Sequence, residues 1–202
     1  NFDGSIVAIG ATGNDGNGSN SGHVRIYENF AGSWSQIGQD IDGEHPGDAS
    51  GGSISISTDG SIIAIGTREN NDAFYKAGHV RVFENIFGTW TQIGQDIDGE
   101  GAIYYSGESI SLSGDGNKIV IGAIGPRNNT YEGEGCIYQN IDGNWIKLGQ
   151  NIYGENPGDN SGDAVAISLD GNTVAIGAPQ NGYYSNSGHV RVYNVLDSSL
   201  CA

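Results

Sequence analysis

The sequence repeats at a period of about 56 residues, and this period constrains the fold more than any other feature. Four copies of the pattern DG-[SN]-x-[VI]-[AV]-IG start at offsets of 56, 56 and 55 residues, at Asp3, Asp59, Asp115 and Asp170. A repeat of this length that runs along a whole chain indicates a protein built from one supersecondary unit used several times.

Each period contains four short apolar runs that read as strands. In the second copy they are SISIS at 53–57, SIIAIG at 61–66, HVRVFE at 79–84 and TWTQIG at 89–94, and we name them strands A to D. The Asp-Gly link between A and B predicts a two-residue hairpin. Four antiparallel strands per 40–60 residues are typical of a propeller blade. The sequence therefore predicts an all-β fold, a β-propeller of four-stranded antiparallel blades with about 3.5 blades in this chain.

The repeat also suggests how the chain is divided. It starts at a strand B and ends after a strand C, so we expect a single propeller segment that closes with further blades or by self-association. The expected divisions are a partial blade 1 at 1–48, blade 2 at 49–104, blade 3 at 105–159 and a partial blade 4 at 160–202.

Charge and composition exclude several classes of partner. With 24 acidic and 8 basic side chains the net charge is −16, which repels the phosphates of nucleic acids. The apolar runs are much shorter than the roughly 20 residues of a membrane helix, so no membrane insertion is expected. Two cysteines, Cys136 and Cys201, do not make a disulfide framework.

Two stretches carry a family resemblance. DGNTVAIGAP followed by GHVRVY resembles the FG-GAP repeat of integrin α-subunit propellers. The motif WxQIGQDIDGE, followed by GDxSG, is similar to FG-GAP-like tandem repeats of secreted and surface proteins of marine bacteria and algae. The resemblance covers essentially the whole chain. It implies a larger propeller of seven blades, an extracellular or cell-surface location, and recognition of protein or glycan.

The sequence departs from that family at two points. The full Gly-Ala-Pro end is present only at residues 177–179, and the calcium loop of the family is reduced to an Asp-Gly turn at Asp59, Asp115 and Asp170. Calcium at that turn therefore does not carry over.

The loops that join B to C and D to A lie on one face of such a propeller and hold nearly all the variation between repeats. Variable loops on a fixed scaffold are where recognition is usually built. Aromatic rings among Gly, Asn and Ser suit protein or sugar surfaces, or alternatively fold down to cover the blade tops. The candidate ligand-binding residues are Phe74, Tyr75, Tyr104, Tyr105, Tyr131, Tyr183 and Tyr184.

The motif GQDIDGE at 38–44 recurs at 94–100, and a variant, GQNIYGE, follows at 149–155. Its carboxylates could supply oxygen ligands to calcium, or they could cap a turn by accepting backbone N–H groups. The candidate metal ligands are Asp40, Asp42, Glu44, Asp48, Asp96, Asp98, Glu100, Glu155 and Asp159.

Two further sets recur with the repeat. His23, His79 and His189 follow a glycine, with Cys136 in the matching place, and the sequence favours structural hydrogen bonding for them over a shared metal. The tryptophans occupy the same position of strand D in each repeat, which predicts that they pack between blades: Trp34, Trp90 and Trp145.

These observations predict an extracellular, non-catalytic binding or adhesion module, assisted by calcium, with no catalytic residues and no enzymatic activity. The alternatives are a purely structural spacer of a long surface protein and a part of a polysaccharide-degrading enzyme. Hydrolysis by a carboxylate pair, with Glu44 or Glu100 as a member, is disfavoured because a catalytic pair is needed once, not in every blade.

Overall fold

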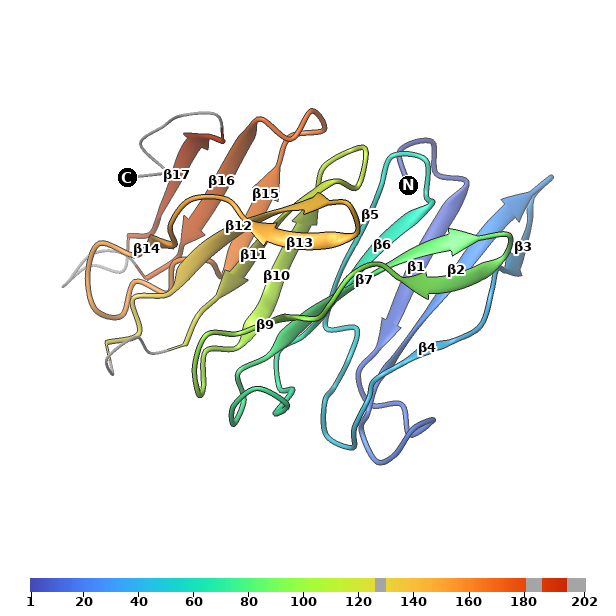
Figure 1. The fold of residues 1–202 in the computed structure, drawn as a ribbon, viewed down its shortest axis with the longest axis horizontal. Helices are drawn as coiled ribbons and strands as arrows, with labels where there is room; N and C mark the ends of the chain where they lie inside the picture. The colour runs from blue at the N-terminus through green and yellow to red at the C-terminus, as the bar shows by residue number, and fades with distance from the viewer. Residues whose placement is uncertain (126–129, 181–186, 196–202) are drawn as a thin grey trace.

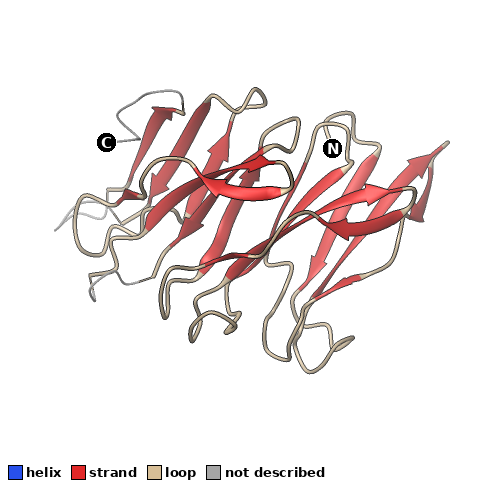
Figure 2. Ribbon diagram, in the orientation of Figure 1, coloured by secondary structure: helices blue, strands red, loops and turns tan. Residues whose placement is uncertain are grey.

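The computed structural model describes residues 1–125, 130–180 and 187–195. Strands and loops alone make up these ranges (Figure 2), which include no helix that could cross a membrane. The prediction of an all-β propeller-type fold is confirmed.

The strands form four antiparallel sheets. The first contains β1 (Ile6–Ala11), β2 (His23–Phe30), β3 (Ser33–Gln36) and β4 (Ile41–Asp42). The second contains β5 (Ser53–Ile56), β6 (Ile62–Thr67), β7 (His79–Ile86), β8 (Thr89–Gln92) and β9 (Ile97–Asp98). The third contains β10 (Ser106–Leu112), β11 (Lys118–Ala123), β12 (Glu134–Ile141), β13 (Asn144–Lys147) and β14 (Ile152–Tyr153). The fourth contains β15 (Ala164–Ile167), β16 (Thr173–Ala178) and β17 (His189–Asn194).

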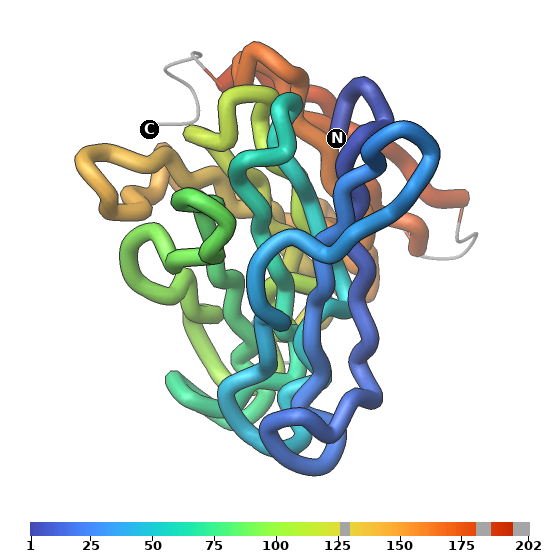
Figure 3. Tube along the Cα trace, turned by 90° about the vertical axis from the view of Figure 1, so that its right-hand side faces the viewer, coloured from blue at the N-terminus to red at the C-terminus, as the bar shows by residue number. Residues whose placement is uncertain are grey.

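The sheets follow one another in chain order across the molecule (Figure 1), and the view from the side shows neighbouring sheets packed face to face (Figure 3). The A strands β5, β10 and β15 contact one another in succession. The second and third sheets therefore pack on both faces against the sheets before and after them, as blades of a propeller do, whereas the first and fourth each pack on one neighbour.

The tight turns are not where the sequence placed them. The A–B link is a four-residue loop, because Ser57 pairs with Ile62, and of Asp59 and Gly60 only the glycine has a positive φ, 82°. Asp59 instead accepts the backbone N–H of Ser61 at 2.9 Å, which closes an Asx turn. The two-residue hairpin with positive φ at both positions is the C–D link, at 31–32, 87–88 and 142–143.

The strand assignment from sequence implied that the acidic motif GQDIDGE begins a loop. In the structure, part of the motif forms a short strand instead. A glycine with positive φ, Gly38 or Gly94, breaks strand D, and the chain then returns to strand C as β4 or β9. The isoleucines of these two-residue strands are buried between sheets, at Ile41, Ile97 and Ile152. Burial of this isoleucine explains why the motif stays in contact with the sheet.

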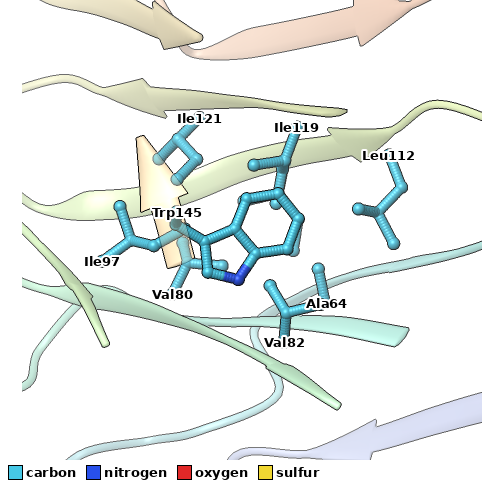
Figure 4. Close-up of a cluster of buried hydrophobic side chains, with 9 residues drawn as sticks. Ala64, Val80, Val82, Ile97, Leu112, Ile119, Ile121 and Trp145 are labelled. Carbon is cyan, nitrogen blue, oxygen red and sulfur yellow. The ribbon is translucent and has the colours of Figure 1, made fainter. Parts of the chain in front are cut away.

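Apolar side chains fill the space between successive sheets. Figure 4 shows Trp145 of the third sheet surrounded by side chains of the second and third sheets, among them Val80, Val82 and Ile119. The tryptophan positions are equivalent, yet Trp90 and Trp145 are 3% exposed while Trp34 is 49% exposed. Packing between blades is thus the role of Trp90 and Trp145, and Trp34 lies on the open face of the first sheet.

Candidate functional site

A cleft of about 300 Å³ opens on the face of the B–C and D–A loops. Its lining residues come from three successive sheets and the loops between them: Thr12, Ala49, Gly52, Arg68, Glu69, Gly107 and Glu108. A hollow of this size with a few convergent polar groups is the usual form of a small-molecule site.

Arg68 stands in the cleft between two glutamates. Its Nη1 donates to Glu108 Oε2 at 2.8 Å, and its Nη2 lies 3.7 Å from Glu69 Oε1. The hydrogen bond to Glu108 raises the pKa of the guanidinium above its ordinary value. Glu69 Oε2 is also 3.5 Å from Lys76 Nζ. The cleft therefore combines fixed positive charge with two carboxylates, all partly open to solvent.

Local backbone structure explains this placement. Arg68 follows β6 directly, where the chain leaves the sheet for the B–C loop. Glu108 lies in β10 where the pairing with β11 shifts between Ser106 and Ser109. A β-bulge of this kind re-aims the side chain at the bulge. Sequence reasoning missed both residues, although Arg68 differs in type from its equivalents in the other three repeats and Glu108 differs from its equivalents in the two other repeats that contain strand A.

A second set of polar residues lies at the junction between the first and second sheets. This junction cluster consists of Glu44, Asp72, His79, Arg81, Asp96 and Asp98. It contains two groups of three that share His79: Glu44 with Asp72, and Asp96 with Asp98. In each group the three ligand atoms lie within 4.8 Å of one another. His79 Nδ1 is 3.9 Å from Glu44 Oε2 and 3.8 Å from Asp96 Oδ2. Arg81 Nη1 lies 3.5 Å from Glu44 Oε1.

His79 is the buried centre of the junction cluster. Its side chain is 0% exposed, and neither ring nitrogen has a hydrogen-bond partner among the described residues. The structural hydrogen bonding predicted for this histidine is therefore wrong. Burial, and then the nearby Arg81, lowers the pKa of His79 to about 4, so the imidazole is neutral at physiological pH. Burial also raises the pKa of Glu44 and of Asp98.

The junction between the second and third sheets differs in its charges. Glu134 stands in the place of His79, since each pairs with the last residue of strand B, and Cys136 stands in the place of Arg81. The assignment of Cys136 to the histidine position is wrong because Gly133, not Gly135, is the matching loop glycine. Lys147 bonds to Glu100 there, and Asn151 donates to Glu134 at 2.8 Å and to Glu100 at 3.2 Å.

The remaining predicted metal ligands are dispersed. Asp40 accepts three hydrogen bonds from Arg25, the shortest of 2.7 Å, and these hold the pKa of Asp40 at about 2. Asp48 and Asp159 are buried turn residues whose carboxylates accept backbone N–H groups at 2.9 Å. Asp42 lies 3.9 Å from His23 Nδ1, and Glu155 lies 3.7 Å from Arg191. The structure thus gathers Glu44, Asp96 and Asp98 from two copies of the motif and adds Asp72 and His79.

The A–B turns do not suit a cation. The carboxylates of Asp59, Asp115 and Asp170 accept hydrogen bonds from a neighbouring hydroxyl and from the N–H two residues on. These bonds use the oxygens that a calcium ion would need.

The predicted aromatic ligand residues lie on separate loops. Phe74, Tyr75 and Tyr131 are exposed, and Tyr104 and Tyr105 are half-buried. Tyr183 and Tyr184 lie outside the described residues.

No protein-family model matches the chain, and no curated protein matches it either. Solved structures do resemble it. A protein named as a 6-phosphogluconolactonase from Bacteroides uniformis is 17% identical, with a TM-score of 0.53 over 85% of this chain and 44% of that one. The periplasmic gluconolactonase PpgL of Pseudomonas aeruginosa is 17% identical, with a TM-score of 0.56 over 94% and 50%. Sqt1 from Chaetomium thermophilum is 18% identical, with a TM-score of 0.58 over 95% and 40%.

These likenesses show the fold, and the chain spans half or less of the length of the structures it matches. They also correct the functional prediction. A non-catalytic binding or adhesion module without enzymatic activity is contradicted by neighbours that are named as lactonases, which are enzymes. The prediction weighed only the repeated carboxylates, whereas Arg68, Glu69 and Glu108 come together once, in a cleft between sheets.

Proposed function

We propose that the chain is part of a propeller hydrolase that opens the cyclic ester of a sugar acid in the cleft of Arg68, Glu69 and Glu108. The observation that carries the proposal is the arginine held between two glutamates at the mouth of a cleft of about 300 Å³. The names of two structural neighbours, a 6-phosphogluconolactonase and a gluconolactonase, support the substrate class.

The side chains can divide the reaction between them. Among the described residues, the carboxylate of Glu69 makes long ion-pair contacts, of 3.7 Å to Arg68 and 3.5 Å to Lys76, so its oxygens can take a proton from water. The water oxygen bonds to the carbonyl carbon of the lactone, and Arg68 stabilises the negative charge on the carbonyl oxygen. The bond from that carbon to the ring oxygen then breaks, and Glu69 returns the proton to the ring oxygen. One water is consumed, and the open hydroxy acid is released.

Glu108 acts as a positioning residue. Its 2.8 Å hydrogen bond fixes one side of the guanidinium and leaves other N–H groups of Arg68 for the substrate. We expect Glu108→Gln to weaken substrate binding more than it slows the chemical step.

The test is hydrolysis of glucono-δ-lactone, followed by acid release in weak buffer and compared with the spontaneous rate. Glu69→Gln should lower the enzymatic rate at least about 100-fold, because a general base contributes roughly 10²–10⁴-fold. Glu84→Gln, an exposed glutamate on β7, is the matched control and should keep the full rate. A folded chain that does not exceed the spontaneous rate, or a fully active Glu69→Gln, would overturn the proposal.

The FG-GAP type of repeat and an exported location belong to the same proposal. The motif DGNTVAIGAP with GHVRVY supports the first, and a neighbour named as periplasmic supports the second.

A further inference from the structure

We propose that the junction cluster binds one divalent transition-metal cation, of the Zn²⁺ or Mn²⁺ class, through His79 and the carboxylates of Glu44, Asp72, Asp96 and Asp98. The inference goes beyond the proposed hydrolysis, because a bound cation is detected without any substrate and the junction cluster shares no residue with the cleft.

The first argument is the buried histidine. A polar side chain removed from water is stable only when its polar atoms are paired. His79 is fully buried with both ring nitrogens unpartnered among the described residues, and Glu44 Oε2 is buried and unpartnered in the same way. Nδ1 of this imidazole lies 3.9 Å from that oxygen. A cation between them would satisfy both atoms at once.

The second argument is the spacing of the ligand atoms. Zinc bonds to nitrogen and oxygen are about 2.0–2.2 Å long, so two ligands of one ion lie about 3–4 Å apart. The distances of 3.9 Å to Glu44 and 3.8 Å to Asp96 fall in this range. The other ligand atoms lie within 4.8 Å of one another in each group of three, so each needs to move by less than about an ångström to reach a shared ion.

The third argument is charge. The junction cluster holds four carboxylates and one guanidinium, that of the buried Arg81, which lies 3.5 Å from Glu44 Oε1. Outside the cluster, His45 Nδ1 lies 3.2 Å from Asp72 Oδ1. At the next junction the same positions are balanced by the protein itself, because Lys147 replaces Gln92 and Asn151 replaces Asp96. Lys147 bonds to Glu100, which is the equivalent of Glu44. An external cation at the first junction would take the place that a lysine ammonium takes at the second.

The nature of the ligands selects the cation. Calcium and magnesium prefer oxygen ligands throughout, whereas imidazole nitrogen with carboxylates suits zinc and manganese. His79 at the centre of the junction cluster therefore favours a transition metal over the calcium expected from sequence.

The experiment uses the full chain after treatment with EDTA and dialysis. Titration with Mn²⁺, followed by electron paramagnetic resonance, and with Zn²⁺, followed by calorimetry, should give one bound ion per chain and a higher Tm. His79→Gln should weaken binding at least about tenfold, since loss of groups that only orient a ligand already costs about 10–100-fold.

Two further variants keep the result decisive. Gln92→Lys combined with Asp96→Asn gives the first junction the lysine and the asparagine of the second while His79 and Arg81 stay in place, so it should abolish binding of both ions and remove the Tm increase. Circular dichroism checks that this variant is folded. His23→Gln alters the equivalent histidine of the first sheet and should leave binding unchanged. Folded wild-type chain that binds neither ion, or His79→Gln with wild-type affinity, would overturn the proposal. Loss of lactone hydrolysis in Glu69→Gln with metal binding intact would separate the two sites.

Discussion

Strand B carries a glycine in every repeat, and the packing of the sheets gives it a specific role. Gly122 lies in β11, and a Cβ added there would stand 1.9 Å from the carbonyl oxygen of Gly162, which lies in the turn that leads into β15 of the next sheet. Real Cβ atoms essentially never approach another heavy atom within 3.0 Å. Since the obstacle is backbone, Gly122→Ala forces the third and fourth sheets apart by about an ångström.

That separation would loosen the apolar layer between these sheets, which includes Val120, Ile137, Val174 and Ile176. Overpacking alone costs about 1–3 kcal/mol, and the lost contacts add to it, so we expect Gly122→Ala to lower the free energy of unfolding by about 3 kcal/mol. For a chain of this length, that corresponds to a fall in Tm of roughly 6–12 °C. Urea unfolding followed by circular dichroism measures the change directly.

The fourth repeat supplies a matched control. Gly177 occupies the same strand position, but the atom nearest to an added Cβ is the Ala164 carbonyl oxygen at 3.4 Å, an ordinary contact. We expect Gly177→Ala to be neutral or to stabilise by up to about 1 kcal/mol, because alanine restricts the unfolded chain. Equal effects of the two substitutions would refute the idea that close approach of neighbouring sheets fixes this glycine.

Two other perturbations test the packing and the charges. Trp145→Ala should lower the free energy of unfolding by about 3–5 kcal/mol, because the ring is 3% exposed and its Nε1–H donates to the Ile93 carbonyl at 3.0 Å. Trp34 is 49% exposed, so Trp34→Ala should cost less than about 1 kcal/mol. Similar urea midpoints for the two variants would contradict the assigned packing. Asp40 has a pKa of about 2 in the folded chain because of its hydrogen bonds to Arg25, against about 3.9 when unfolded. Its stabilisation is therefore present above about pH 4 and is lost as the pH falls to about 2, so Asp40→Asn should flatten the pH dependence of unfolding in that window, and parallel curves for the two proteins would count against the ion pair.

The repeat predicts the fold well because its signal is local and is read several times. The alternating apolar residues of SIIAIG and HVRVFE fix which face of each strand is buried, and they pair in register as β6 and β7. The phase of Trp90 and Trp145 gives the packing between sheets for the same reason.

Details that depend on one dihedral angle or one residue of register were harder to predict. Asp-Gly is compatible with two turn geometries, and the hydrogen bonds of Ser57 and Ser61 to Asp59 select the longer loop. Cys136 was matched to a histidine because two glycines, Gly133 and Gly135, stand two residues apart and either could mark the start of strand C.

The sequence named Glu44, Asp96 and Asp98 as metal ligands, but not the residues that they meet, because each candidate site is assembled from residues far apart in the sequence. Arg68 and Glu108 are 40 residues apart and meet through a β-bulge. Glu44 leaves the first sheet and reaches His79 of the second, while Asp72 joins them from a variable B–C loop. A single sequence contains no signal for such contacts between repeats.

The repeated motif therefore has two separable consequences. Its isoleucine holds the chain against the sheet in all three copies, and this role is structural. Its acids are delivered each time to the junction with the next sheet, but their chemistry is decided by what that sheet presents: His79 with Asp96 at the first junction, and Glu134 with Lys147 and Asn151 at the second. The constant residues of the repeat are thus structural, and the ion site that we propose depends on residues that differ between the two junctions. The Gln92→Lys and Asp96→Asn exchange tests that difference, because it gives the first junction the lysine and the asparagine of the second while His79 and Arg81 stay in place.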